Sequence, residues 1–164
     1  MARYRVFSKN MRRVEWSNIK THGVTKFMDM TPMEFQRKYL NLKISVSDTI
    51  RLNNVKPLNV NAPEKWDWRD EGCVNHVKDQ GSCGSCWAFA STANMEGQYY
   101  LKTKKAITLS EQQLVDCDTI DQGCNGGLME NTFQWLIENG GIMSDKDYRY
   151  TSFEGSEYYT QLIC

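Results

Sequence analysis

The sequence predicts a mainly helical chain built from two parts with different compositions. All six cysteines lie between Cys73 and Cys164, whereas residues 1–61 contain none and carry more Lys and Arg than Asp and Glu. Both parts hold helix-start signals, because a Thr or Ser is followed three residues later by Glu or Gln in 31–34 and in 110–113. A shift in composition between two stretches that each contain such signals indicates two units with separate roles.

Length and charge limit the classes of function. The 164 residues are 40% hydrophobic, which suits one ordinary domain or a small domain with an extension. Twenty basic residues balance twenty acidic residues, so no net charge favours nucleic acid or an anionic membrane as a partner. No apolar run approaches the ~20 residues that span a bilayer.

The cysteine content and the N-terminus give conflicting indications about the cellular compartment. Six cysteines favour an oxidising environment, but residues 1–5 lack the apolar core of a secretory signal peptide. The two observations agree if the sequence is a fragment, or a truncated gene model, of a longer secreted protein.

The leader, residues 1–61, begins with a stretch that favours a helix up to about Ile19. Its apolar residues recur at helical intervals, although they form no clean stripe. The alternation of side-chain types in residues 24–28 is typical of a short strand.

A second leader helix is expected to begin at Thr31. Pro32 suits the first helical position, and Glu34 completes a capping box with Thr31. Residues 41–61 show no helical period, and Pro57 favours an extended path there.

A glycine-bearing loop leads from Gln80 into a helix expected over residues 85–103, which places Cys86 in its first turn. Small side chains near the start of this helix let it pack closely, while Trp87 and Phe89 supply bulk for a core. A helix N-terminus carries partial positive charge and unpaired N–H donors. Both favour the thiolate, which is the nucleophilic form of cysteine.

Two shorter helices are expected further along the chain. Ser110 and Gln113 form a capping-box pattern that opens a helix over residues 110–117. Residues 124–129 are interpreted as a tight loop, followed by a helix through Leu136. The two adjacent glycines of this loop would let another backbone approach closely.

His22 and His76 are candidate bases for the thiol, because a cysteine nucleophile normally needs an imidazole. His76 lies ten residues before Cys86 in an expected loop, and His22 belongs to the leader. Neither is expected to be catalytic.

Several motifs resemble those of one family. The active-site signature of the papain and cathepsin cysteine proteases is similar to Gln80-Gly81-Ser82-Cys83-Gly84-Ser85-Cys86-Trp87-Ala88-Phe89. The interrupted Glu-Arg-Phe-Asn-Ile-Asn pattern of their pro-segments, without its glutamate, resembles Arg3-x-x-Val6-Phe7-x-x-Asn10-x-x-x-Val14-x-x-x-Asn18. The Gly-Asn-Phe-Asp motif that follows, with threonine replacing asparagine, is similar to Gly23-x-Thr25-x-Phe27-x-Asp29. The start of the mature enzymes resembles Trp66-Asp67-Trp68-Arg69.

This resemblance, closest in pattern to the cathepsin L group, implies the α+β papain-like cysteine protease fold. Residues 1–61 would be an N-terminally truncated inhibitory pro-segment whose extended tail lies in the active-site cleft. Residues 62–164 would be the N-terminal half of the peptidase domain. The chain would then cover mainly the helical pro-segment and the helical left-hand domain, with the β-rich half missing.

The resemblance also assigns the site residues. Cys86 is expected to be the nucleophile, and the Gln80 amide with the Cys86 N–H is expected to hold the oxyanion. Residues expected to bind substrate lie beside the helix start and in the later glycine loop: Gly84, Trp87, Asn125, Gly126, Gly127, Leu128 and Met129. Leu128 and Met129 would line an apolar pocket for the substrate side chain second from the scissile bond. No metal or cofactor is implied.

The resemblance selects among the possible disulfide pairings. It implies a bond between Cys83 and Cys124 beside the free Cys86. It also expects a partner for Cys117 shortly after a Tyr-Pro-Tyr segment, which here reads Tyr148-Arg149-Tyr150. Glu157 stands where that partner should be and Cys164 follows seven residues later, so Cys117–Cys164 is one candidate pair and the pairing of Cys73, Cys117 and Cys164 stays open. Cys73 has no counterpart in the family pattern.

The family's catalytic histidine and asparagine lie ~130–150 residues beyond the cysteine. Only 78 residues follow Cys86 in this sequence, so neither is expected to be present. The chain alone is therefore expected to be inactive, as one part of a cysteine-type endopeptidase zymogen that acts on peptides or proteins. The family places such enzymes in lysosomes or outside the cell.

Two other functions remain open. The leader would serve as a pro-segment-type inhibitor of intact papain-like proteases, although an inhibitor has no use for Cys86 or Gln80. A thiol oxidoreductase would use Cys83-x-x-Cys86, and a disulfide between these two cysteines would support it.

Overall fold

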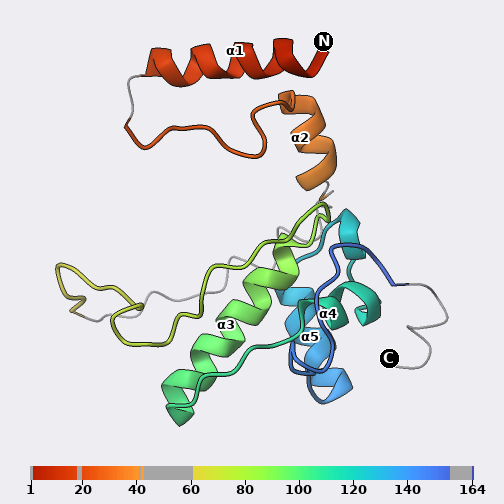
Figure 1. Ribbon diagram of the computed structural model, residues 1–164. Coiled ribbons are helices and arrows are strands. Elements are labelled where there is room, and N and C mark those ends of the chain that lie inside the picture. The colour runs from red at the N-terminus through yellow and green to blue at the C-terminus, as the bar shows by residue number, and fades with distance from the viewer. Residues whose placement is uncertain (1, 18–19, 41, 43–60, 156–163) are drawn as a thin grey trace. The chain divides into compact units, whose positions relative to one another are not determined.

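The computed structural model describes residues 2–17, 20–40, 42, 61–155 and 164. The chain forms two compact units, Met1–Asn41 and Leu42–Cys164, called the first and second units below. The elements in chain order are the helices α1 (Ala2–Ser17), α2 (Pro32–Tyr39), α3 (Cys86–Thr103) and α4 (Glu111–Cys117), the short 3-10 helix η2 (Gly123–Asn125), and α5 (Met129–Asn139) (Figure 1). Strand pairing in the described residues is limited to one isolated bridge between Leu109 and Ser144. The prediction of a mainly helical chain is confirmed.

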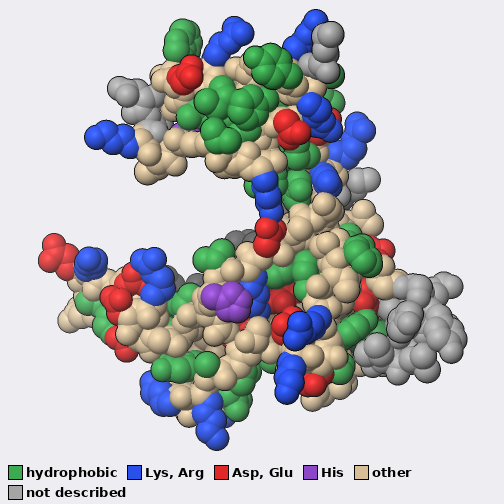
Figure 2. Space-filling model, viewed as in Figure 1, with side chains coloured by type: hydrophobic (Ala, Val, Ile, Leu, Met, Phe, Trp, Pro, Cys, Tyr) green, Lys and Arg blue, Asp and Glu red, His purple; other side chains and the backbone are tan. Residues whose placement is uncertain are grey.

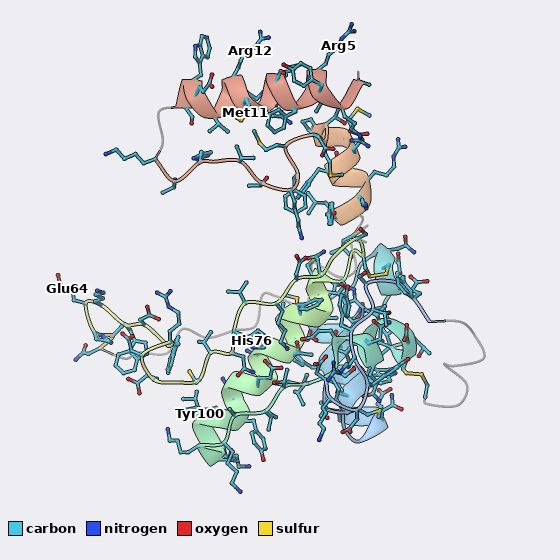
Figure 3. The ribbon with its side chains drawn as sticks, in the orientation of Figure 1. Arg5, Met11, Arg12, Glu64, His76 and Tyr100 are labelled. Atoms are coloured by element: carbon cyan, nitrogen blue, oxygen red, sulfur yellow. A yellow bond between two sulfur atoms is a disulfide. The ribbon has the colours of Figure 1, made fainter. Side chains whose placement is uncertain are left out.

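In the first unit, one face of α1 packs against the turn that follows it. The half-buried residues of α1 include Phe7, Asn10, Met11 and Val14, whose spacing places them on one side of a helix. Asn10 Nδ2 donates hydrogen bonds to the carbonyl oxygens of Met28 (2.9 Å) and Met30 (3.0 Å). Figure 3 shows Met11 on the side of α1 that faces this segment, and Arg5 and Arg12 on the other side. A polar side chain thus holds α1 in place.

The second helix of the first unit begins as predicted. Thr31 Oγ1 accepts a hydrogen bond from the Glu34 N–H (3.2 Å), and Glu34 Oε2 accepts one from the Thr31 N–H (2.8 Å), which completes the capping box. The rings of Phe27, Phe35 and Tyr39 pack together, with centroids 5.0 to 5.3 Å apart.

The strand predicted over residues 24–28 is wrong. The segment forms a turn instead, in which the Met28 N–H donates to the Thr25 carbonyl (3.1 Å) and the Met30 N–H to the Phe27 carbonyl (2.9 Å). The turn brings the Phe27 ring onto α2, and aromatic packing takes the place of strand pairing. The predicted extended tail, residues 41–61, falls almost wholly outside the described residues.

The core of the second unit lies where α3 packs against both α4 and α5 (Figure 1). Its buried side chains come from all three helices and from the disulfide-bonded cysteines: Cys83, Trp87, Ala88, Leu114, Val115, Cys117, Trp135 and Leu136. Small residues at the start of α3 allow this close packing, as the sequence predicts.

The capping box predicted at the start of α4 forms only in part. Ser110 Oγ accepts a hydrogen bond from the Gln113 N–H (3.0 Å). The Gln113 side chain instead accepts from the Met143 N–H (2.6 Å), while the Ser110 N–H donates to the Met143 carbonyl (3.0 Å). In a full capping box the Gln113 side chain would accept from the Ser110 N–H. Here the backbone of Met143 binds both of these groups instead.

A buried ion-pair network ties the loop before α3 to α3 and α4. Lys78 Nζ lies 2.8 Å from Glu96 Oε1 and 2.5 Å from Glu111 Oε1, and the two glutamates are 4% and 1% exposed. The carboxylates also accept hydrogen bonds from Asn75 (2.8 Å) and Thr92 (2.7 Å). Burial alone lowers the pKa of Lys78, but its hydrogen bonds to Glu111 and Glu96 outweigh burial and raise that pKa. The network holds the segment that leads to Gln80.

Candidate active site

The candidate nucleophile is the first residue of α3. Cys86 is exposed and carries a free thiol, whereas the other free cysteine, Cys73, is buried. Cys83, three residues earlier, is bonded to Cys124, with their Cα atoms 4.7 Å apart. The second disulfide joins Cys117 to Cys164. Because Cys83 is bonded to Cys124, a Cys83–Cys86 redox pair is absent from this structure.

Hydrogen bonds along its length hold the loop that precedes Cys86. Gln80 Nε2 donates to the Cys83 carbonyl (2.8 Å), and the Gly84 N–H donates to the Cys124 carbonyl (2.9 Å). The side-chain amide of Gln80 has two N–H groups, so one remains for another acceptor. At the start of α3 the Ala88 N–H already donates to the Ser85 carbonyl (2.9 Å), whereas the N–H groups of Cys86 and Trp87 precede the first intrahelical bonds. One N–H of the Gln80 amide and the N–H groups of Cys86 and Trp87 are therefore available as hydrogen-bond donors.

Tyr150 is a contact that the sequence did not predict. Its hydroxyl donates to the Gln80 carbonyl (2.7 Å) and lies 2.6 Å from Ser85 Oγ. The sequence prediction used residues 148–150 only as a marker for a disulfide partner. The sequence offers only two tyrosines on either side of Arg149 here, and this pattern does not indicate a contact between Tyr150 and Gln80.

The glycine loop forms a wall whose two glycines are required by close contacts. Gly126 has a φ of +121°, and a Cβ there would lie 2.9 Å from the Cα of Leu42. A Cβ on Gly127 would lie 2.5 Å from the Trp87 ring. Among the described residues of the expected tail, Leu42 therefore lies directly against this wall.

Trp87 supports the wall from behind. The side chain is 2% exposed, and its Nε1 donates to the Gly123 carbonyl (3.0 Å). Its side chain therefore faces the interior, and the expected role of Trp87 in substrate binding stays a prediction. Gly84 is likewise buried. Asn125 and Met129 are exposed and Leu128 is half-buried, so these three are accessible.

Two aspartates that the sequence prediction missed lie behind the same wall. Asp121 Oδ1 accepts from the Leu128 N–H (2.9 Å) and from Asn131 Nδ2 (3.0 Å), which fixes the start of α5. Asp118 is 5% exposed, and its Oδ2 has no hydrogen-bond partner among the described residues. Burial, with the nearby Asp121 carboxylate contributing, raises the pKa of Asp118 to about 6.

The structure does not bring His76 to the thiol. His76 lies along α3 in an exposed position (Figure 3). It lines a hollow of about 420 Å³ together with Cys73, Lys78, Gln80 and Phe89, but Cys86 is not among the residues that line it. The described part of the chain holds no group of three or more His, Cys, Asp or Glu side chains placed to bind a metal ion. It also holds no helix with the length and apolarity needed to cross a membrane.

Comparisons with known proteins converge on one family. Residues 62–161 match the family model described as papain family cysteine protease. The chain is 46% identical over 168 residues to cysteine proteinase 15A of Pisum sativum, with 94% of this chain and 46% of the relative covered. It is 47% identical over 165 residues to procathepsin L of Rattus norvegicus, with 94% and 49% covered.

Solved structures agree with the sequence relatives. The proform of the ragweed pollen cysteine protease Amb a 11 matches with a TM-score of 0.80 and 41% identity, covering 94% of this chain and 51% of that one. Digestive procathepsin L2 from Tenebrio molitor matches with a TM-score of 0.79 and 36% identity, covering 94% and 55%. The chain spans about half the length of the curated relatives it matches.

Proposed function

Because this chain belongs to the papain family of cysteine proteases and is cathepsin L-like, we propose that Cys86 is the nucleophile of a cysteine endopeptidase zymogen. The observation that carries the proposal is the position of its thiol. Cys86 is free and exposed at the N-terminus of α3, next to a cysteine that is already bonded elsewhere. The positive end of the helix favours the thiolate that attacks a carbonyl.

The residues around Cys86 suit peptide hydrolysis. The Cys86 sulfur would attack the carbonyl carbon of a peptide, and the carbonyl electrons would move to its oxygen. The free N–H of Gln80 and the backbone N–H of Cys86 would donate to that oxyanion. Losing one such donor typically costs about 3 kcal/mol of transition-state stabilisation. The amine then leaves with a proton, and water releases the acyl group from the sulfur.

The proton donor for the leaving amine is the part that these residues do not supply. His22 and His76 are the two histidines of the sequence; His22 belongs to the leader, and His76 lines a hollow whose lining does not include Cys86. The 164 residues by themselves would therefore hydrolyse no peptide. A purified chain that turned over a fluorogenic dipeptide, with the turnover lost in Cys86→Ser, would contradict this part of the proposal.

The leader would occupy the cleft as a pro-segment. The position of Leu42 supports this, because Leu42 lies against Gly126, in the wall that would otherwise pair with substrate. Asn125, Leu128 and Met129 then remain as side chains for substrate contact, and Leu128 with Met129 would favour an apolar group. The maturation boundary near Ala62, the peptide substrates, and a lysosomal or secreted location belong to the same proposal.

A chimera tests the function directly. Residues 1–155 of this chain would be joined to the C-terminal half of rat procathepsin L, a relative with 47% identity over the matched part. We expect peptide hydrolysis after removal of the leader, loss of it in Cys86→Ser, and a drop of about 100-fold or more in kcat for Gln80→Ala. A folded chimera whose Cys86→Ser variant kept full activity would refute the proposal.

The alternative function is inhibition of intact papain-like proteases by the leader. It would be favoured if residues 1–61 alone inhibited a related protease at nanomolar concentration while the second unit was dispensable. Inhibition by the leader would require neither the free thiol of Cys86 nor the disulfide-braced loop beside it. The zymogen is therefore the better-supported proposal.

A further inference from the structure

The hydroxyl of Tyr150 joins the two ends of the loop that carries the proposed oxyanion donors. It donates to the Gln80 carbonyl at 2.7 Å and lies 2.6 Å from Ser85 Oγ. A phenol has one proton. Since that proton goes to Gln80, the Ser85 hydroxyl donates its own proton to the Tyr150 oxygen. A single side chain therefore bridges the residue that supplies the amide and the residue before the nucleophile.

This bridge also explains why the N-cap of α3 is unusual. Ser85 is the N-cap residue, and a serine there normally accepts a hydrogen bond from the N–H of the second or third helical residue. Ser85 is fully buried, adopts φ −99° and ψ 18°, and makes no such bond. Its hydroxyl is turned towards Tyr150 instead. The Ala88 N–H donates to the Ser85 carbonyl instead (2.9 Å), and the N–H groups of Cys86 and Trp87 receive no cap from the Ser85 side chain.

Tyr150 is itself held rigidly. Its ring packs edge-on against Phe89, with centroids 4.8 Å apart. The next residue, Thr151, donates its N–H to Gln112 Oε1 (2.8 Å), which attaches the segment to α4. Gly155 is fixed in the same way, because its N–H donates to Asp116 Oδ1 (2.7 Å). Burial raises the pKa of Tyr150, so the hydroxyl keeps the proton it donates.

The same segment fits the loop at a second point. Gly81 has a φ of +63°, and a Cβ there would lie 2.6 Å from the Cβ of Ser152. Residues 150–155 thus contact both Gln80 and its neighbour, and they do so from an anchor on α4.

We infer that Tyr150 is a positioning residue, whose hydroxyl fixes the separation of Gln80 and Ser85 and so aims the Gln80 amide beside Cys86. The inference rests on the proposed peptidase function. It assigns no contact with substrate to Tyr150, which acts through Gln80.

The test measures the reversible addition of Cys86 to a small aldehyde. With ¹³C-labelled N-acetylglycinal, the sulfur bonds to the aldehyde carbon and the C=O π electrons move to oxygen. The thiol proton ends on that oxygen, giving a hemithioacetal with its own NMR signal. The probe is small enough to need only the atoms around Cys86, and the full 164-residue chain is used.

Four proteins form a double-mutant cycle: the unaltered chain, Gln80→Ala, Tyr150→Phe and the double variant. We expect Gln80→Ala to weaken aldehyde binding about tenfold and Tyr150→Phe about three- to tenfold, the size of one hydrogen bond. In the Gln80→Ala background, Tyr150→Phe should have no further effect. A residue that merely stabilised the fold would weaken binding equally in both backgrounds.

Tyr148→Phe is the matched control. It deletes the same hydroxyl group from the same segment, but that hydroxyl binds Asp116 Oδ2 (2.5 Å) and not the loop. We expect it to leave aldehyde binding unchanged. Amide hydrogen exchange of residues 81–86 should become faster in Tyr150→Phe and stay the same in Tyr148→Phe.

The outcomes separate the inference from the function on which it rests. If Gln80→Ala binds the aldehyde as well as the unaltered chain, the proposed oxyanion role fails and the inference fails with it. If Gln80→Ala weakens binding but Tyr150→Phe does not, or does so equally in both backgrounds, the inference alone is overturned. Unchanged hydrogen exchange of residues 81–86 in Tyr150→Phe would also overturn it.

Discussion

In the first unit, Met28 is the buried hydrophobic side chain among the described residues, whereas the second unit buries a core drawn from three helices and carries two disulfides. The first unit depends on the hydrogen bonds of Asn10, a capping box and three half-exposed rings. Figure 2 shows hydrophobic side chains on the surface of this unit. Trp16, for example, is 94% exposed. Because burial of apolar surface is the main stabilising term, the first unit should open at a much lower free energy than the second.

This difference suits the proposed roles. A pro-segment has to be released, while the half that carries the nucleophile has to persist.

Removing the lysine from the buried ion-pair network should cost the most. Lys78→Met leaves Glu96 and Glu111 as two buried carboxylates without a cation, which is expected to destabilise the second unit by about 3–5 kcal/mol. Urea denaturation followed by tryptophan fluorescence measures this. The matched change in the first unit is Arg3→Ala, which breaks an ion pair with Glu34 whose side chains are 59% and 43% exposed. Arg3→Ala should have the same stability as the unaltered chain. A loss of unfolding free energy as large as that of Lys78→Met would contradict the difference between the two units.

Removing the disulfide beside the nucleophile should have the next largest effect. Replacing Cys83 and Cys124 together by serine opens a loop with a sequence separation of 41. Loops of that size are expected to contribute about 2–4 kcal/mol. Thermal denaturation should show a lower Tm for the second unit, with limited proteolysis of the first unit unchanged. Equal acceleration of cleavage in both units would show that their stabilities are linked.

A methyl group on Gly127 should destabilise the second unit by about 2–3 kcal/mol, because overpacking against a fixed ring forces the backbone to move. In Gly127→Ala the new Cβ would lie 2.5 Å from Trp87 and 2.8 Å from Asp121. Gly23→Ala in the first unit is the control, because nothing lies within 4 Å of a Cβ there. Denaturation midpoints compare the two variants. A Gly127→Ala variant as stable as Gly23→Ala would mean that the wall adapts.

Acid should affect the two units in opposite directions. The pKa of Asp118 is raised to about 6 from an ordinary value of 3.8, so between these values the folded chain binds a proton that the unfolded chain does not. The stability of the second unit therefore falls as pH rises through 6, by about 1 kcal/mol between pH 5 and pH 7. In the first unit, hydrogen bonds from Thr31 lower the pKa of Glu34 below 4.5, so its stabilisation is lost as pH falls further.

Denaturation at pH 5 and pH 7 tests this sign. The unaltered second unit should be more stable at pH 5, and Asp118→Asn should lose most of that difference. An Asp118→Asn variant with the full difference would assign the pH dependence to other groups.

The positions of the helices in both units were easier to predict from the sequence than the contacts between residues that are distant in the chain. Thr31 and Ser110 mark helix starts because a cap is a local signal that needs no tertiary information. The alternation in residues 24–28 carried no information about whether a partner strand exists, so the predicted strand was wrong. The ion pair of Lys78 with Glu111 spans 33 positions and the bond of Tyr150 to Gln80 spans 70.

Contacts over such separations depend on how the loop before α3 and the segment around Tyr150 pack against the rest of the second unit, and a local sequence pattern contains no information about that packing. The helix start at Cys86 was predictable from the small and apolar residues that follow it, and its assignment as the candidate nucleophile came from the resemblance of residues 80–89 to the family signature. The hydrogen bonds of Tyr150 to Gln80 and Ser85 and the burial of Asp118 were not predictable. Each depends on how segments that are distant in the sequence pack together.

The rate at which iodoacetamide alkylates Cys86 at pH 6 tests the central claim most directly. At this pH an ordinary thiol is almost wholly protonated and reacts slowly. If Cys86 is the exposed nucleophile at the start of α3, the folded chain should be alkylated there faster than the same cysteine in the urea-unfolded chain, because N–H donors at a helix start stabilise an anion. The buried Cys73 should be slower in the folded chain. Equal or slower alkylation of Cys86 in the folded chain would contradict its assignment as an activated nucleophile.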